Sequence, residues 1–269
     1  MIRFMMITND PVLARRAEAA GIERIFVDTE IIGKQERQGH LDTLISKHSL
    51  EDIRRIKPVL ENAELIARLN PMHAGTESEI ETAIANGADI LMLPMVHSAA
   101  EVAEFAGLVA GRASVIPLVE TRAAVDALEQ IVSIAGVDEI YIGLNDLHLD
   151  MGLSFMFEPV ADGLLDIMAQ TLRRAGLPFG FGGVARVGEG VVPGEMVLGE
   201  HARLGSTAVI LSRTFSRNLP EGNQQALAME VGKLRSAYQR LTLRSSAEIR
   251  LDHQLFNETV TAYAQSKKR

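Results

Sequence analysis

Residues 85–93 read ANGADILML, and the stretches AAGIERIFV at 19–27 and RLGSTAVIL at 203–211 share this pattern. In each stretch, the end of an amphipathic segment is followed by a glycine and then by a short, mainly apolar run. A glycine at the end of a helix, followed directly by a strand, is typical of the short loops that return the chain to a parallel sheet. The three stretches therefore predict repeated helix-to-strand connections.

Short apolar runs alternate with longer amphipathic segments along most of the chain. The runs show little polar alternation, which is typical of strands that are buried on both faces in a parallel sheet. They lie at 3–7, 24–27, 65–69, 90–94, 115–119, 139–143, 178–181 and 208–211. The helical segments between and after them lie at 11–20, 50–61, 77–86, 99–110, 122–134, 160–175 and 194–204.

Eight such units predict a (β/α)8 TIM barrel over residues 1–217. The competing fold, a doubly wound open sheet, would place a glycine-rich turn after the first strand, whereas this turn reads ITNDPV at 7–12. Residues 218–269 exceed what the last helix of a barrel requires. Their helical patterns at 224–242 and 246–264 predict a C-terminal helical extension, with one extra helix, that packs on the barrel or on a neighbouring subunit.

The composition excludes several classes of protein. With 27 Lys and Arg against 35 Asp and Glu, the net charge is −8, which argues against a nucleic-acid partner. The absence of cysteine excludes disulfides, thiolate metal ligands and a cysteine nucleophile. No apolar run reaches the ~20 residues of a membrane span, and the N-terminus MIRFMMITND lacks a signal pattern. We therefore expect a soluble cytoplasmic protein without a membrane partner.

Polar residues at the ends of the apolar runs mark the candidate site, because the active site of a parallel barrel lies at the carboxyl ends of its strands. Glu120 and Asp146 end successive runs. Two neighbouring carboxylates repel each other unless a cation or a proton lies between them, and oxygen ligands favour Mg²⁺ or Mn²⁺. The alternative is that Glu120 caps a helix and Asp146 belongs to a turn.

Arg68 lies near the end of the run at 65–69 and is therefore expected to be buried and paired. Its guanidinium is suited to hold a carboxylate or an enolate; the alternative is a structural salt bridge to Asp28 or Glu30. Arg186 and Arg213 are secondary candidates for binding an anion. No lysine ends an apolar run, so a Schiff-base mechanism has no obvious candidate.

The long polar loop at 30–48 exceeds the usual loop length and is expected to be functional. It contains His40 and His48, which are candidates for a general base near neutral pH.

Five blocks carry a resemblance to a known family: IFVDTE at 25–30, IARLNP at 66–71, NGADILMLPMVHSAAEV at 86–102, VIPLVETRAAVDALEQI at 115–131 and GVDEIYIGLNDLHLDMG at 136–152. Together they resemble the HpcH/HpaI aldolase and citrate lyase β-subunit superfamily of pyruvate-type barrels. The resemblance implies that Glu120 and Asp146 bind a divalent metal, Mg²⁺ or Mn²⁺. It also implies that Arg68 holds the oxo acid and stabilises its enolate, and that Asp28 is the family aspartate on the second strand.

The resemblance further implies that the backbone near Pro94 and Met95 lines the pyruvate site, and we add Glu30 and Asn145 as substrate-binding candidates. In the aldolases of this family, a histidine directly follows the acid after the second strand, but here Ile31 occupies that place. His40 or His48 is expected to supply the base from the loop, the other candidate being a metal-bound water with Asp28. Replacement of each histidine by alanine is then expected to abolish turnover without loss of the metal.

The predicted function is that of a divalent-metal-dependent carbon–carbon lyase, a class II-type aldolase that cleaves or forms a 4-hydroxy-2-oxo acid through a pyruvate enolate. Two alternatives stay open. One is a citrate lyase-like enzyme that cleaves or hydrolyses a citramalyl- or malyl-type thioester, and the other is a non-catalytic member that binds a small acid. The expected partner is a small 2-oxo acid, and the resemblance implies a homo-oligomer, either a trimer or a hexamer.

Overall fold

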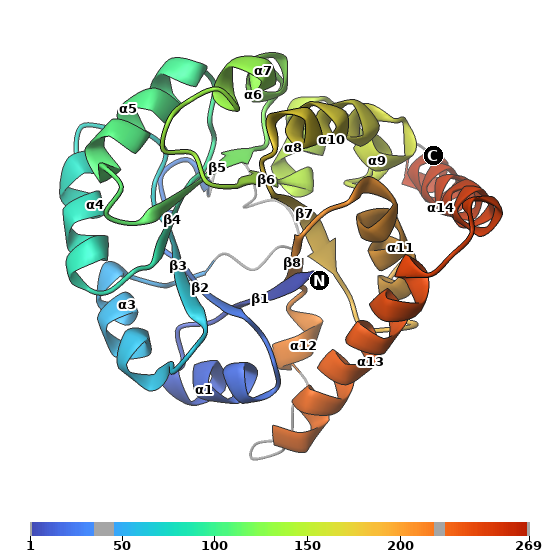
Figure 1. Ribbon diagram of the computed structural model, residues 1–269, viewed down its shortest axis with the longest axis horizontal. Coiled ribbons are helices and arrows are strands. Elements are labelled where there is room, and N and C mark those ends of the chain that lie inside the picture. Colours follow the sequence, from blue (N-terminus) through green and yellow to red (C-terminus); the bar gives the residue numbers. More distant parts are fainter. Residues whose placement is uncertain (1, 35–45, 218–223, 268–269) are drawn as a thin grey trace.

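The computed structural model describes residues 2–34, 46–217 and 224–267. Eight parallel strands close into a barrel in chain order, with β8 pairing back onto β1 (Figure 1). The predicted (β/α)8 barrel is thus confirmed. The strands are β1 Arg3–Ile7, β2 Arg24–Asp28, β3 Glu64–Arg68, β4 Ile90–Leu93, β5 Ser114–Val119, β6 Ile140–Ile142, β7 Phe179–Val184 and β8 Ala208–Leu211.

Helices surround the barrel on its outside (Figure 1). They are α1 Pro11–Ala19, α3 Leu50–Ile56, α4 Thr76–Ala85, α5 Ala99–Val109, α6 Arg122–Asp126, α7 Leu128–Ile131, α10 Leu164–Ala175 and α11 Gly194–Leu204. Shorter helical segments are η1 Lys57–Val59, α8 Leu144–Asp150, α9 Glu158–Ala161 and α12 Thr214–Arg217. The helix predicted at 122–134 is divided into α6 and α7. The helix predicted at 160–175 is also divided, because Gly163 has a φ of +82° and caps the start of α10.

Apolar side chains fill two layers of the structure. The interior of the barrel holds a small cluster that includes Phe26, Ile66, Met92 and Ile116. A larger cluster lies between the strands and the surrounding helices. Because the interior is packed with apolar groups, polar chemistry is placed at the ends of the strands.

Ion pairs close the amino-terminal end of the barrel. The Arg24 guanidinium contacts Glu64 and Glu139 at 2.8 Å each, and Arg3 contacts Glu139 at 3.0 Å. Arg24 and Glu139 are almost fully buried, so their charges compensate each other within the protein. This end therefore has a structural role, and the opposite end is left for function.

Strand β7 extends beyond the run predicted at 178–181: it continues to Val184 and so includes Gly182 and Gly183. A Cβ at Gly180 would lie 2.4 Å from the Tyr141 ring, so glycine makes room for this tyrosine. The Tyr141 hydroxyl donates to the Gly182 carbonyl at 2.6 Å and accepts from the Ile210 amide at 2.9 Å. The same region of β7 carries an irregular register against β8, and Tyr141 bridges it.

Replacement of Tyr141 by phenylalanine is expected to lower the free energy of unfolding by about 1–3 kcal/mol, because it leaves buried backbone groups of two strands without their partner. Urea unfolding measures the change. Replacement of the half-exposed Tyr238 by phenylalanine is the control, with an expected change within about 0.5 kcal/mol. An equal effect of the two substitutions would contradict the bridging role.

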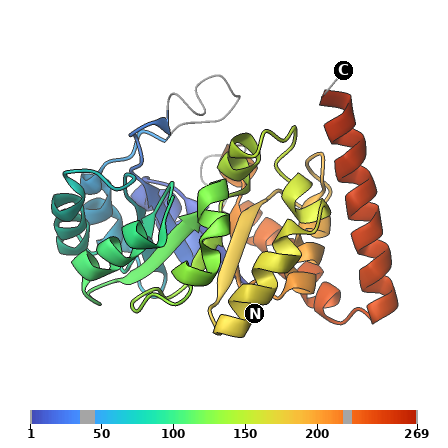
Figure 2. The same cartoon turned by 90° about the horizontal axis from the view of Figure 1, so that it is seen from above.

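The C-terminal extension consists of α13 Gln224–Thr242 and α14 Ser246–Lys267. Helix α13 packs on α11 and α1, and α14 packs on α11 and α9, so both cover their own barrel; α14 runs along its flank (Figure 2). Phe256 and Val260 of α14 belong to the large apolar cluster. The oligomeric state stays a prediction. Among the described residues, no helix is long and apolar enough to cross a membrane.

Candidate active site

A cavity of about 390 Å³ lies at the carboxyl-terminal ends of the strands. Four of the residues predicted for the site line this cavity together: Arg68, Glu120, Asn145 and Asp146. Their side chains come from β3, the end of β5 and the start of α8. A larger hollow of about 560 Å³ lies along the outer surface of α14 and contains none of the predicted residues. The strand-end cavity is therefore the candidate active site.

Glu120 and Asp146 are the two carboxylates of this cavity, and both are buried. Burial raises the pKa of Glu120 well above its usual range, and the negative charge of Asp146 raises it further. The Met95 amide donates to Glu120 Oε1 at 2.9 Å, which fixes the orientation of the carboxylate. The absence of a side chain at Gly143 also matters, because a Cβ there would lie 2.4 Å from Glu120 Oε2.

This pair fits a hard divalent cation. Two neighbouring buried carboxylates are stabilised when a cation lies between them. Among residues 2–34, 46–217 and 224–267, no group of three or more Asp, Glu or His side chains is placed so that it could hold a metal ion. Mg²⁺, however, is commonly held by one or two carboxylates, with water or substrate completing its coordination. The donor set of Glu120 and Asp146 thus suits Mg²⁺ or Mn²⁺.

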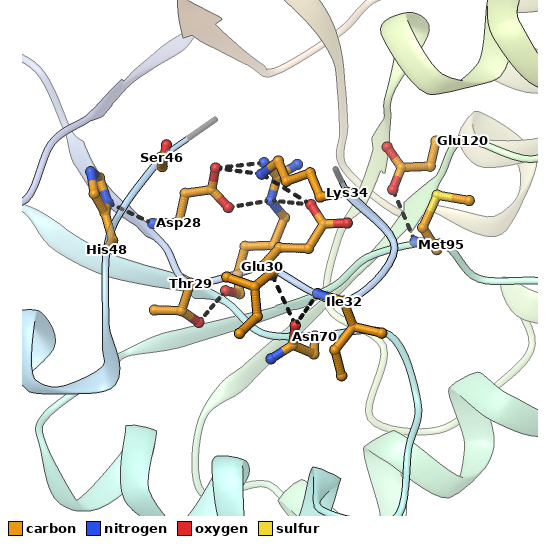
Figure 3. A network of polar contacts seen from close by, with 12 residues as sticks. Asp28, Thr29, Glu30, Ile32, Lys34, Ser46, His48, Asn70, Met95 and Glu120 are labelled. Atoms are coloured by element: carbon orange, nitrogen blue, oxygen red, sulfur yellow. Dashed lines mark hydrogen bonds and ion pairs between the residues drawn. The ribbon is translucent and has the colours of Figure 1, made fainter. Parts of the chain in front are cut away.

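A buried cluster of two cations and two anions lies near Glu120 (Figure 3). Arg68 uses Nε and Nη2 to hold Asp28, at 2.9 and 2.8 Å. Lys34 Nζ lies 2.7 Å from Asp28 Oδ2 and 3.2 Å from Glu30 Oε2, and Arg68 Nε lies 3.4 Å from Glu30 Oε2. The salt bridge considered as an alternative for Arg68 therefore exists, and Arg68 also lines the cavity.

Asp28 is fully buried in this cluster. Burial acts to raise the pKa of Asp28, but the charges and hydrogen bonds of Arg68 and Lys34 outweigh it and hold this pKa well below its usual range. A carboxylate held in this way is a poor proton acceptor. The geometry thus makes Asp28 the anchor of Arg68 and disfavours it as the base.

Asn70 holds the beginning of the second βα loop. Its Oδ1 accepts hydrogen bonds from the Ile31 and Ile32 amides, both at 2.9 Å (Figure 3), and its Nδ2 donates to Glu79 at 2.5 Å. These contacts turn the chain after Glu30 so that Lys34 returns to the cavity. The sequence indicated Lys34 only as a structural partner of Asp28 and Glu30, a pairing that the structure confirms. Its place at the cavity was not predicted, because it lies beyond the strand end.

His48 is placed differently from its predicted role. Its Nδ1 accepts the Asp28 amide at 3.0 Å, and in Figure 3 it lies on the opposite side of the cation cluster from Glu120. Burial lowers the pKa of His48, and this effect exceeds the opposing influence of Asp28 and Asp52. His48 is not among the residues that line the cavity. The arrangement makes it a support for strand β2.

The other predicted residues divide into three groups. His40 lies outside the described residues. Glu30 belongs to the buried cluster around Arg68 and Lys34. Met95, whose φ is +50°, contributes its backbone amide to Glu120. Glu30, Pro94 and Met95 are not among the residues that line the cavity. Arg213 lines the cavity next to Ser212 and Thr214, whereas Arg186 packs over the Phe215 ring outside it.

The fold and the site together define a (β/α)8 barrel with a carboxylate pair and a cationic cluster at its carboxyl-terminal rim. The family model described as HpcH/HpaI aldolase/citrate lyase matches residues 8–159, which is more than half of the chain. This chain therefore belongs to the HpcH/HpaI aldolase/citrate lyase family. The match covers Glu120, Asp146, Arg68 and Lys34, and ends before β7.

A curated relative is the hydroxypyruvate/pyruvate aldolase of Roseovarius nubinhibens, 30% identical over 141 residues, which cover 39% of this chain and 54% of that protein. The chain thus spans about half the length of the curated relative that it matches. Among solved structures, an HpcH/HpaI aldolase/citrate lyase family protein from Burkholderia cenocepacia has a TM-score of 0.62 at 15% identity, over 89% of this chain and 94% of that one.

CitE from Mycobacterium tuberculosis, solved in complex with magnesium and acetate, has a TM-score of 0.61 at 17% identity, over 94% of this chain and 97% of that one. At these identities, the structural similarities show a common fold.

Proposed function

We propose that this chain is a divalent-metal-dependent carbon–carbon lyase that cleaves or forms a 4-hydroxy-2-oxo acid through a pyruvate enolate. The observation that carries the proposal is the buried pair of Glu120 and Asp146 in one cavity with Arg68. Family membership and the similarity to a pyruvate aldolase support the same class of reaction.

The bond that breaks joins C3 and C4 of the substrate. A base removes the proton of the C4 hydroxyl, an aldehyde forms, and the electron pair of the broken bond moves to the ketone oxygen of the pyruvate fragment. Protonation of this enolate at C3 completes the reaction. Because negative charge develops on the ketone oxygen, groups that stabilise this oxygen accelerate the cleavage.

Glu120 and Asp146 would hold the divalent cation. When bound, this cation supplies Lewis-acid stabilisation of the oxo acid, worth several kcal/mol. Arg68 adds a fixed positive charge beside the same oxygen, since Asp28 prevents its guanidinium from turning away. The apolar side chains in the barrel interior keep water from entering the cavity from the barrel side. His40 is our candidate for the base, because Asp28 and His48 are engaged elsewhere.

The experiment is an assay of pyruvate release from a panel of 4-hydroxy-2-oxo acids with Mg²⁺ or Mn²⁺, repeated with a chelator. Pyruvate release that the chelator abolishes is the expected result. Release of an acyl thioester or of free coenzyme A from citramalyl- or malyl-type thioesters would instead support the citrate lyase-like alternative. Binding of pyruvate without turnover of either class would support a non-catalytic acid-binding protein.

A further inference from the structure

The buried cluster of Lys34, Arg68, Asp28 and Glu30 turns its positive side toward the cavity. Its two cations line the cavity, but its two carboxylates do not. The carboxylates are nearly inaccessible to solvent, with 0% exposure for Asp28 and 1% for Glu30. A ligand in the cavity therefore meets a positively charged wall, behind which the compensating negative charges lie.

Both cations have hydrogen-bond donors that the cluster does not use. Arg68 holds Asp28 through Nε and Nη2, and none of the described residues accepts a hydrogen bond from its Nη1. The Lys34 ammonium has three N–H groups, and its contacts within the described part of the chain are those to Asp28 and Glu30. A third donor is thus left for a ligand.

We propose that Lys34, together with the outer edge of Arg68, forms a carboxylate-binding subsite that holds the C1 carboxylate of a 2-oxo acid. The inference rests on the proposed function, since it takes the ligand to be an oxo acid. Lys34 is a substrate-binding residue in this assignment. It fits the geometry because two adjacent cations with free donors match the paired oxygens of one carboxylate.

The surroundings of Lys34 separate this role from that of a Schiff-base lysine. Its nitrogen is held between two carboxylates as an ammonium, and an ammonium has no lone pair with which to attack a ketone. The subsite therefore binds an anion without forming a covalent bond.

The test compares Lys34→Met and Lys34→Arg with the wild type by titration calorimetry. The probes are Mn²⁺ alone and then oxalate and pyruvate in the presence of Mn²⁺. Lys34→Met is expected to weaken oxalate and pyruvate binding by about 10- to 100-fold, as for the loss of one charged hydrogen bond. The affinity for Mn²⁺ alone is expected to stay within about 3-fold. Lys34→Arg, which keeps the charge, is expected to recover most of the binding.

The matched control is Lys57→Met, because Lys57 forms an ion pair with Asp89 at the opposite end of the barrel; its ligand binding should equal that of the wild type. If Lys34→Met does not fold, Lys34→Gln carries the same expectation. Unchanged oxalate binding in a folded variant would overturn the assignment, as would an equal loss of Mn²⁺ affinity.

Borohydride reduction in the presence of pyruvate provides an independent check: a mass increase on Lys34 would also overturn the assignment, and an unmodified Lys34 supports it. A wild type that binds neither oxalate nor pyruvate would overturn the proposed function together with the subsite. A wild type that binds both, beside a Lys34→Met variant that binds equally well, would overturn only the subsite.

Discussion

Replacement of Glu120 by glutamine is expected to abolish Mg²⁺ binding and lower turnover by at least about 10³-fold, while it makes the metal-free protein more stable. Removal of one of two carboxylate ligands accounts for the loss of the metal, and the loss of Lewis-acid stabilisation accounts for the turnover. The gain in stability arises because burial and the charge of Asp146 disfavour the ionised form of the Glu120 carboxylate in the folded, metal-free protein. Glutamine keeps the Oε1 atom that accepts the Met95 amide.

This gain in stability depends on pH in a defined direction. The pKa of Glu120 is raised on folding, so the metal-free wild type loses stability as the pH rises from the ordinary glutamate value of about 4.3 through the raised pKa. The Glu120→Gln variant lacks this loss. The metal-free variant should therefore be as stable as the metal-free wild type near pH 4 and more stable at pH 8. Each kcal/mol of added free energy of unfolding should raise the Tm by about 2–4 °C.

Thermal unfolding at several pH values, with a chelator and with Mg²⁺, measures both effects. Added Mg²⁺ should raise the Tm of the wild type, because it binds the folded state, but not that of the variant. The exposed Glu104 on α5 provides the control substitution, Glu104→Gln, which should behave like the wild type. A variant that still gains stability from Mg²⁺ would show that Glu120 is not a metal ligand.

Replacement of Arg68 by methionine is expected to lower the free energy of unfolding by about 3–5 kcal/mol, the cost of removing one partner from a buried ion pair. Asp28 and Glu30 would remain buried with Lys34 as their single cation among the described residues. Turnover is expected to fall by about 10³-fold, because the developing enolate loses a fixed positive charge. Arg68→Lys keeps the charge but cannot hold Asp28 with two parallel hydrogen bonds, so it should recover stability only in part.

The double variant Arg68→Met/Asp28→Leu separates the two roles of Arg68. It removes the uncompensated carboxylate together with the cation, and it should therefore be more stable than Arg68→Met alone. Its turnover should stay as low as that of the single variant. Urea unfolding and the pyruvate assay measure the two quantities. A double variant that regains activity would mean that Arg68 acts only by holding Asp28.

Much of the barrel and the placement of the Glu120 and Asp146 carboxylates in one cavity could be predicted from local sequence. A helix that ends at a glycine and is followed by a short apolar run predicts a strand from neighbouring residues alone. Repetition of this unit along the chain predicts a closed barrel. Once the strands are parallel, their carboxyl ends must meet at one rim. Glu120, Asp146 and Arg68 could be assigned to the site because each lies at the end of its apolar run or within three residues of it.

The roles of Asp28 and His48 could not be derived in the same way. Both were expected to act on the substrate, but their functions depend on partners from other parts of the chain. Asp28 is held by Arg68 from the adjacent strand and by Lys34 from the loop, and His48 accepts the Asp28 amide. Gly180 of β7 is a further case, because it makes room for Tyr141 on the neighbouring strand.

Local sequence was sufficient to predict the barrel, the rim at which polar residues gather and the residue types near the end of each strand, because these depend on neighbouring residues and on the periodicity of the chain. Which charges face the cavity depends instead on the folded structure. Lys34 reaches the site because Asn70 turns the loop after β2, and Asp28 and Glu30 are placed behind the cations. Contacts between residues far apart in the chain decide such an arrangement, and no local pattern records them.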